Sequence, residues 1–306
     1  MRALAPLLLL AGLAIAGCSD GAESPARSED APTSETPRTS APRRTLEPLP
    51  ESPSPTPRAT SEKAPRPPIV GADMSWPQCP KGMGISEKRS QGAPLPLDSA
   101  AFVVLGLTNG PGFTPNPCLP DMVQWVRERD LLVAAYAVGS FPDAAAVERY
   151  GGLGPFDGST REGALSNTGY QQARFNVTSM LRTGLETPVV WIDVEPVPDF
   201  EWSADLEANA AVVRGLARGY RSAGYRIGVY STPLLWDTVV GDLSLGVPEW
   251  RAAGQTSMAE ALNRCGAPWV IQGGPSVMGQ WVEDNRDHNV TCPGTADEMD
   301  RWFHRY

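Results

Sequence analysis

Residues 188–196 read Pro-Val-Val-Trp-Ile-Asp-Val-Glu-Pro, an apolar, β-branched run that ends in two carboxylates and a proline. This pattern is typical of a buried strand whose tip carries functional groups. Because side chains alternate across a strand, Asp193 and Glu195 share a face. Two neighbouring carboxylates raise the pKa of one of them, which suits acid/base chemistry on a glycosidic bond. In the alternative interpretation, the same acids cap a neighbouring helix or pair with an arginine.

Predicted strands and helices alternate on both sides of this stretch. The expected strands are 69–76, 101–108, 131–138, 188–195, 226–231, 248–253, 268–272 and 287–291. The expected helices are 119–129, 167–183 and 204–223. Such alternation predicts an α/β fold with a parallel sheet wrapped by helices, and eight strands in one domain favour a (β/α) TIM-like barrel.

Acidic residues lie near the predicted ends of several strands, where a barrel of this kind gathers its functional groups. The catalytic candidates are Asp73, Asp193, Glu195 and Asp287. The substrate-binding candidates beside them are Trp76, Tyr136, Trp191, Tyr230 and Gln272. The glycine-rich segment 139–167 is predicted to be an enlarged loop that covers or reshapes the mouth of the barrel.

The N-terminal segment, residues 1–18, has the features of an export signal. A single early positive charge, Arg2, precedes an apolar run that is too short to span a bilayer comfortably. The run closes on Ile-Ala-Gly before Cys18, which resembles a bacterial lipobox. That resemblance implies lipidation of Cys18 and anchoring at the outer face of the cell membrane. An ordinary signal peptide with an incidental cysteine is the alternative.

Residues 19–68 are rich in Pro, Ser and Thr and contain no aromatic residue. Such a segment cannot bury enough apolar surface to fold, so we expect a disordered linker. Residues 69–306 then form the folded domain, which holds all nine tryptophans. The net charge of −9 argues against a nucleic-acid partner, because phosphate contacts need basic patches. We expect a monomer that meets the membrane only through its lipid anchor.

Four cysteines lie in the folded domain: Cys79, Cys118, Cys265 and Cys292. An even number outside the cytosol predicts two disulfides, with three possible connectivities. We favour 79–118 and 265–292, because each pair lies within one end of the domain. A zinc site is the rival interpretation, but no Cys-x-x-Cys occurs and the spacings are wide.

The folded domain resembles glycoside hydrolase family 25, the muramidase or lysozyme-like family. The best match is Val-Trp-Ile-Asp-Val-Glu at 190–195, followed by Gly-Tyr-Arg-Ile-Gly-Val-Tyr-Ser at 224–231. Gly-Ala-Asp-Met-Ser-Trp at 71–76, Ala-Ala-Tyr at 134–136, Trp-Val-Ile-Gln at 269–272 and Asp-His-Asn at 287–289 also match.

This resemblance implies a (β/α) barrel that cuts the peptidoglycan glycan strand after N-acetylmuramic acid. It implies that Glu195 is the general acid, and that Asp193, Asp73 and Asp287 position substrate or stabilise positive charge at the sugar carbon. It implies no metal and no organic cofactor.

The chain departs from the family pattern at three places that line the glycan groove. Trp-Pro-Gln-Cys at 76–79 replaces Trp-Gln-Gly, Ala-Val follows Tyr136, and Leu-Thr-Asn-Gly at 107–110 lacks the usual charged residues. These changes keep a second hypothesis open, a non-hydrolytic envelope lipoprotein that binds glycan on the same scaffold. A serine hydrolase is a distant third, because only His288 and His304 are present and no Gly-x-Ser-x-Gly motif occurs.

Overall fold

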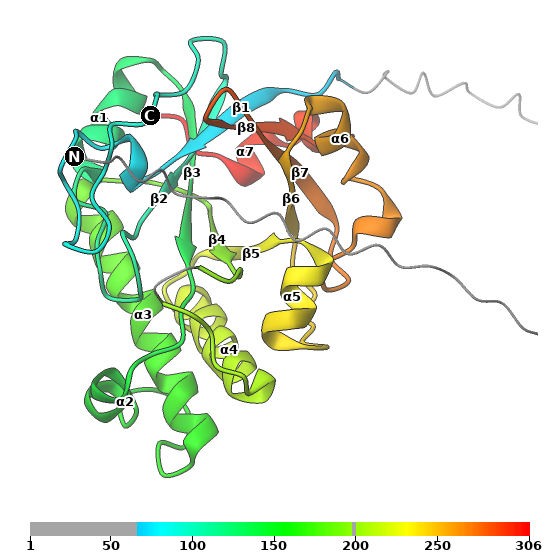
Figure 1. Ribbon diagram of the computed structural model, residues 1–306. Coiled ribbons are helices and arrows are strands. Elements are labelled where there is room, and N and C mark those ends of the chain that lie inside the picture. Colours follow the sequence, from blue (N-terminus) through cyan, green and yellow to red (C-terminus); the bar gives the residue numbers. More distant parts are fainter. Residues whose placement is uncertain (1–65, 198–199) are drawn as a thin grey trace, which may run out of the picture. The chain divides into compact units, whose positions relative to one another are not determined.

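The computed structural model describes residues 66–197 and 200–306 (Figure 1). They belong to one compact unit that spans Ser61–Tyr306. The predicted signal peptide, Cys18 and all but the last three residues of the predicted linker lie outside the described residues. Among the described helices, none is both long and apolar enough to cross a membrane.

Eight strands close a barrel in chain order, which confirms the predicted fold class. The strands are β1 Val70–Met74, β2 Phe102–Gly106, β3 Leu132–Val138, β4 Val189–Asp193, β5 Arg226–Ser231, β6 Glu249–Gln255, β7 Ser276–Glu283 and β8 Arg286–Thr291. β1 to β7 run parallel, whereas β8 is antiparallel to both β7 and β1. The barrel is therefore closed by a hairpin rather than by a last helix-and-strand unit.

The prediction of a strand at 268–272 was wrong. That segment holds a short 3-10 helix, Ala267–Trp269, and the seventh strand begins at Ser276. β7 and β8 are joined by Asp284 and Asn285, both at positive φ, the backbone that a tight two-residue hairpin requires. The apolar run at 268–272 is short and starts with proline, so apolar composition alone misplaced the strand.

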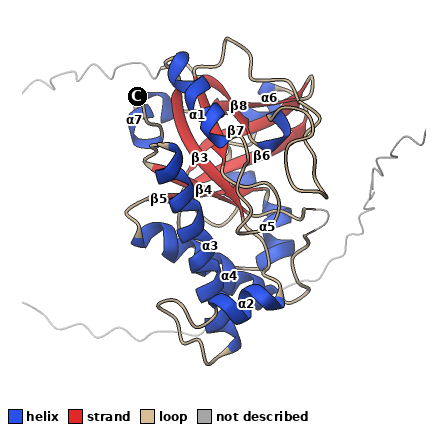
Figure 2. Ribbon diagram, turned by 90° about the vertical axis from the view of Figure 1, so that its left-hand side faces the viewer, coloured by secondary structure: helices blue, strands red, loops and turns tan. Residues whose placement is uncertain are grey.

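Helices cover the outside of the barrel between the strands. They are α1 Leu119–Glu128, α2 Ala144–Tyr150, α3 Arg161–Thr183, α4 Leu206–Ser222, α5 Pro233–Val240, α6 Met258–Asn263 and α7 Met299–Trp302. α3 and α4 lie side by side (Figure 2). Glycine permits their close approach, because a Cβ on Gly169 would lie 2.1 Å from the Val212 carbonyl oxygen. The predicted loop at 139–167 is partly helical, since α2 lies within it and α3 begins at Arg161.

Alternation along β4 divides its side chains between two apolar layers. Val190 and Ile192 pack outward against the helices, while Val189 and Trp191 pack inside the barrel. The interior is dominated by aromatic rings, and Trp191 makes an edge contact with Trp250 at a centroid distance of 6.2 Å.

The C-terminal segment fills the end of the barrel away from the strand tips. Trp302 and Phe303 join the inner aromatic layer, where Phe303 lies 4.5 Å from Phe102 between ring centroids. His304 exchanges two backbone hydrogen bonds of 2.8 Å with Val133 on β3. This packing leaves the opposite, C-terminal end of the parallel strands for a functional site.

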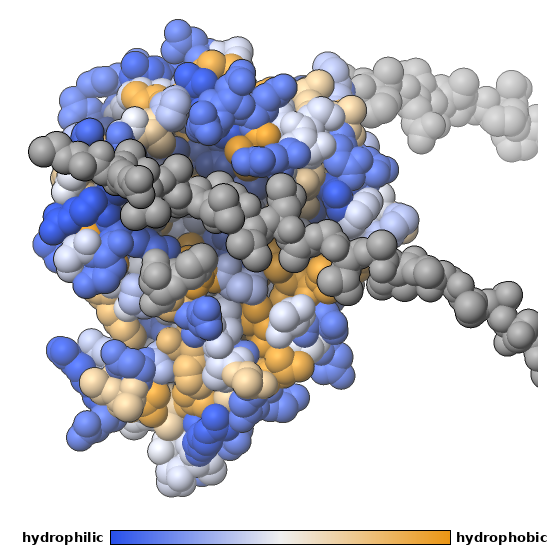
Figure 3. Space-filling model, in the orientation of Figure 1, coloured by the Kyte–Doolittle hydropathy of each residue, from blue (hydrophilic) through white to orange (hydrophobic). Residues whose placement is uncertain are grey.

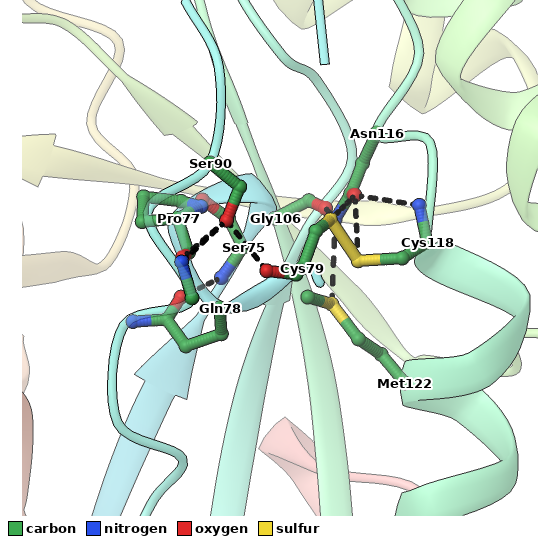
Figure 4. Close-up of a disulfide and its surroundings, with 10 residues drawn as sticks. Ser75, Pro77, Gln78, Cys79, Ser90, Gly106, Asn116, Cys118 and Met122 are labelled. Atoms are coloured by element: carbon green, nitrogen blue, oxygen red, sulfur yellow. Dashed lines mark hydrogen bonds between the residues drawn. A yellow bond between two sulfur atoms is a disulfide. The ribbon is translucent and has the colours of Figure 1, made fainter. Parts of the chain in front are cut away.

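Both predicted disulfides are confirmed. Cys79–Cys118 has a Cα separation of 5.7 Å and Cys265–Cys292 one of 5.6 Å. The first joins the loop after β1 to the start of α1 (Figure 4). There Asn116 donates to the Gly106 carbonyl at 2.8 Å and accepts from the Cys118 amide at 3.1 Å. Disulfides of this kind are typical of exported proteins.

One face of the domain carries exposed apolar side chains over α4 and α5 (Figure 3). Leu206 and Leu234 contribute to it, and Leu234 is 72% exposed. The upper part of the same view is mainly hydrophilic.

Candidate active site

A cavity of about 430 Å³ opens at the C-terminal end of the parallel strands. All four predicted acids line it, from three strands that are far apart in the chain. Asp73 lies near the end of β1, and Asp193 ends β4 with Glu195 two residues beyond. Asp287 lies near the start of β8, which reaches the same end of the barrel because β8 runs in the opposite direction. The predicted acids are thus brought together.

Asp193 is only 3% exposed, and its Oδ1 has no hydrogen-bond partner among the described residues. Burial raises the pKa of this carboxyl well above its usual range, and the nearby Glu195 and Asp73 raise it further. A buried acceptor without a partner is costly, commonly by about 1–3 kcal/mol. Asp193 therefore contributes a buried carboxyl group with one unpaired oxygen to the wall of the cavity.

Asp73 is held by two amide side chains. Gln280 on β7 and Asn289 on β8 donate to its Oδ2 at 3.0 and 2.8 Å. Tyr230 donates to Gln280 at 2.7 Å, and the Trp250 indole donates to Asn289 at the same distance. The pKa of Asp73 is raised well above its usual range by burial and then by Asp287, although these two amide bonds act in the opposite direction.

Glu195 is only partly buried, unlike Asp193 and Asp73. Its backbone carbonyl accepts a hydrogen bond from the Trp202 indole at 3.1 Å. The preceding residue is tied to β5, since the Val194 carbonyl accepts from Ser231 Oγ at 2.6 Å. Burial raises the pKa of Glu195, and repulsion from Asp287 adds to the rise. This carboxyl therefore combines access to the cavity, a fixed backbone and a tendency to hold its proton.

Five other residues were predicted to line the site, and two of them do. Tyr136 and Tyr230 line the cavity. Trp191 is fully buried in the inner aromatic layer, and Trp76 lies in a 3-10 helix packed against the outer apolar layer. Gln272 follows no strand: its side chain donates to the Val247 carbonyl at 2.6 Å, outside the cavity lining.

The sequence analysis missed Gln280, Asn289 and Arg264. Gln280 was missed because β7 was misplaced. Asn289 lies on the last strand, which was expected at 287–291, but its role depends on its pairing with Gln280 across the β7–β8 hairpin. Arg264 lines the cavity from beyond α6, stacks over Trp269 at 3.3 Å and pairs with Glu260 at 2.9 Å. It brings a positive charge to the wall of an otherwise acidic site.

A buried ion pair on β6 stabilises the part of the structure beside this wall of the cavity. Arg251 and Glu249 on β6 lie 2.7 Å apart with side chains 3% and 0% exposed. Glu249 also accepts backbone hydrogen bonds from Ile271, Gln272 and Gly274, all at 2.9 Å. The pair therefore fixes the irregular segment that occupies the place of the wrongly predicted strand.

The described residues contain no group of three or more His, Cys, Asp or Glu side chains arranged to hold a metal ion. The chemistry of the cavity is that of carboxyl, amide and phenol groups in a partly desolvated space. Such a set can donate a proton, accept hydroxyl hydrogen bonds and stabilise positive charge.

The sequence is similar to lysozymes around β4. A family model described as "Lysozyme-like protein 1" matches residues 160–260. Over 66 residues the chain is 38% identical to "Probable GH family 25 lysozyme 4" of Dictyostelium discoideum, covering 21% of this chain and 30% of that protein. It is also 39% identical over 77 residues to "Counting factor 45-1" of the same organism, covering 25% of each chain. The matches thus span less than a third of either relative.

Two solved structures have a similar arrangement at low sequence identity. A family GH25 lysozyme from Aspergillus fumigatus is 14% identical with a TM-score of 0.47, covering 77% of this chain and 99% of that one. A lysozyme from Streptomyces coelicolor is 12% identical with a TM-score of 0.47, covering 76% of this chain and 96% of that one.

The match of the family model to residues 160–260 shows that the chain is lysozyme-like in sequence over the segment that carries β4, α4 and Glu195.

Proposed function

We propose that the domain is a glycoside hydrolase that cleaves a peptidoglycan-type glycan with Glu195 as general acid. The observation that carries this proposal is the convergence of four carboxyl groups in one cavity, with the most deeply buried of them lacking a partner. Carboxyl groups whose environments separate their pKa values divide the acid and base roles in glycoside hydrolysis.

Glu195 donates its proton to the oxygen of the leaving sugar as the glycosidic bond breaks, and water then adds to the sugar carbon and gives up a proton to the Glu195 carboxylate, which restores the acid. Its raised pKa keeps the proton available at a higher pH than an ordinary glutamate would. Asp193 and Asp73 lie deeper, and burial raises their pKa values; the positive charge that develops on the sugar favours their ionised form, which in turn stabilises that charge. Asp287 lies across the mouth and raises the pKa of Glu195 by repulsion.

The similarity to a probable family 25 lysozyme supports an envelope glycan as the substrate class. The two disulfides support an exported location. The proposal extends to the N-terminal part of the chain. Residues 1–18 direct export, and Cys18 carries a lipid. Residues 19–68 are a tether that lets residues 69–306 reach the glycan.

A non-hydrolytic glycan-binding protein is the second candidate. It is favoured by the altered groove positions, because Trp76 packs against the outer apolar layer and does not line the cavity. In this case the carboxyl groups would accept hydroxyl hydrogen bonds without a turnover step.

The Glu195→Gln variant tests the proposal. Glutamine keeps the shape but cannot transfer the proton, so hydrolysis of purified peptidoglycan should fall by about 10²–10⁴-fold. Glu128→Gln, an exposed residue on α1, is the matched control and should keep the wild-type rate. Equal turnover by Glu195→Gln and wild type would remove Glu195 from the mechanism. Glycan binding without turnover by the wild type would favour the second candidate.

A further inference from the structure

A second cavity, of about 660 Å³, is built from the loops that follow β2, β3 and β4, together with α2 and α3. These loops leave the same end of the barrel as the four acids. Its lining contains four aromatic residues, Phe113, Phe141, Tyr150 and Phe200, and three charged residues at the rim, Asp143, Arg149 and Glu201. Neither the sequence motifs nor the acid/base site accounts for it.

One residue of the aromatic wall, Phe113, has an unfavourable backbone conformation. Phe113 has φ of 69°, in the left-handed region that bulky residues rarely occupy. Its ring stacks on Tyr150 with centroids 4.4 Å apart and meets the edge of Phe175 at 5.8 Å. Strain of this kind costs about 1–3 kcal/mol and is concentrated at binding and catalytic sites. The strained conformation of the loop places the Phe113 ring against Tyr150 of α2.

A buried polar group lies in the same wall. Gln172 is 2% exposed, and its Nε2 donates to the Ser140 carbonyl at 3.1 Å. Its Oε1 has no hydrogen-bond partner among the described residues. The Ser140 hydroxyl accepts from the Gly112 amide at 2.7 Å, and a Cβ on Gly112 would lie 2.5 Å from the Gln172 side chain. The amide is therefore locked in place while its oxygen stays unpaired.

Aromatic walls with a few fixed polar groups suit a sugar ring. The apolar C–H faces of a pyranose pack on aromatic rings, and its hydroxyl groups form hydrogen bonds with the charged side chains of the lining. The rim carries charges of both signs, which favours a neutral sugar over a strongly anionic group.

One loop lines both cavities, and a second loop, which lines only the second cavity, is hydrogen-bonded to the backbone of Asp193. In the loop after β3, the Gly139 amide donates to the Asp193 carbonyl at 2.8 Å, and Phe141 lines the second cavity two residues later. The loop after β4 carries Glu195 in the first cavity and Phe200 in the second. Trp202 of that loop returns to hold the Glu195 carbonyl.

We propose that the second cavity is a remote glycan subsite, which binds a neutral sugar of the same strand that Glu195 cleaves. This inference rests on the proposed function and adds a region of the chain, 139–167, that the acid/base chemistry does not use. It makes the domain selective for glycan strands that are long enough to occupy both cavities at once.

The test compares Tyr150→Ala and Arg149→Ala with the control Leu153→Ala, which changes an exposed side chain just beyond α2. For long, peptide-free glycan strands, KM should rise by about tenfold in Tyr150→Ala with kcat nearly unchanged. For short chitin-type oligosaccharides, kcat/KM should stay at the wild-type value. A similar change for both lengths, or no change for either, would overturn the proposal.

A binding measurement separates this proposal from the proposed function. Sedimentation with insoluble glycan is measured for Glu195→Gln alone and for Glu195→Gln with Tyr150→Ala. A weaker association of the double variant supports the subsite even if the wild type shows no turnover. Equal association of the two overturns it. Arg149→Ala removes an exposed side chain whose guanidinium lies 5.1 Å from the Tyr150 ring centroid, so it tests the charged group and the face of Tyr150 that it covers.

Discussion

The carboxyl groups of Glu195 and Asp287 both line the cavity at the mouth of the barrel, and electrostatic repulsion from Asp287 raises the pKa of Glu195. Burial is the larger cause of the raised Glu195 pKa, and Asp287 is the next. An acid with a raised pKa stays protonated to a higher pH, so the proposed reaction should slow as pH rises through that value. The position of this basic limb therefore reports the combined effect of burial and of Asp287 on the pKa of Glu195.

We expect Asp287→Asn to move the basic limb of the kcat/KM profile to lower pH. Asparagine removes the repulsion but not the burial, so the pKa of Glu195 falls part of the way towards its usual value. The measurement is a pH–rate profile on soluble glycan. Asp284→Asn, in the turn between β7 and β8, is the control and should leave the limb unchanged. A limb that does not move in Asp287→Asn would show that Asp287 is not coupled to Glu195.

The acids of the site could be predicted from sequence because each lies at or near the end of a recognisable strand. Asp193 and Glu195 are two residues apart, and the alternation of β4 places both on the inner side. The amides around Asp73 could not be predicted, because their role depends on the pairing of β7 with β8. Trp191 was misassigned because its place on the inner side of β4 put it deep among aromatic rings, below the acids.

At the level of elements, β6 and the segment after α6 depend on one another. The Glu249 carboxylate is fully buried, pairs with Arg251 and accepts three backbone amides from residues 271–274. No sequence pattern indicated this, because a charged pair inside a predicted strand is more often exposed. The hydrogen bonds to Glu249 explain how the irregular segment 271–274 stays ordered where a strand was expected.

We expect Glu249→Gln to lower the free energy of unfolding by about 3–5 kcal/mol, since it leaves Arg251 buried without its counter-charge. Urea denaturation followed by fluorescence measures the change. Glu207→Gln breaks an exposed pair with Arg214 and should cost no more than about 1 kcal/mol. Equal losses in the two variants would show that burial does not strengthen the pair.

On the scale of the whole molecule, each disulfide ties a connecting segment to a neighbouring part of the framework. Cys265–Cys292 joins the segment after α6, which carries Arg264, to the residue that follows β8. Cys265→Ser with Cys292→Ser should lower the free energy of unfolding by about 2–4 kcal/mol. Thermal unfolding with and without a reducing agent measures this. The double variant keeps Cys79–Cys118, so a reductant that destabilises the wild type more than the double variant would confirm the assignment, whereas equal shifts in the two would contradict it.

Closure of the barrel by β8 has a consequence for the order of events during biogenesis. The hydrogen bond from Asn289 to Asp73 spans 216 positions of the chain, and β1 stays unpaired on one side until β8 arrives. Contacts of such long range form late, because the loop between them must first be ordered. A polypeptide that emerges from a secretion pore with its N-terminus first therefore holds Asp73 in an incomplete pocket until the last hairpin has crossed. The acid-lined cavity is therefore complete only after the β7–β8 hairpin has paired with β1.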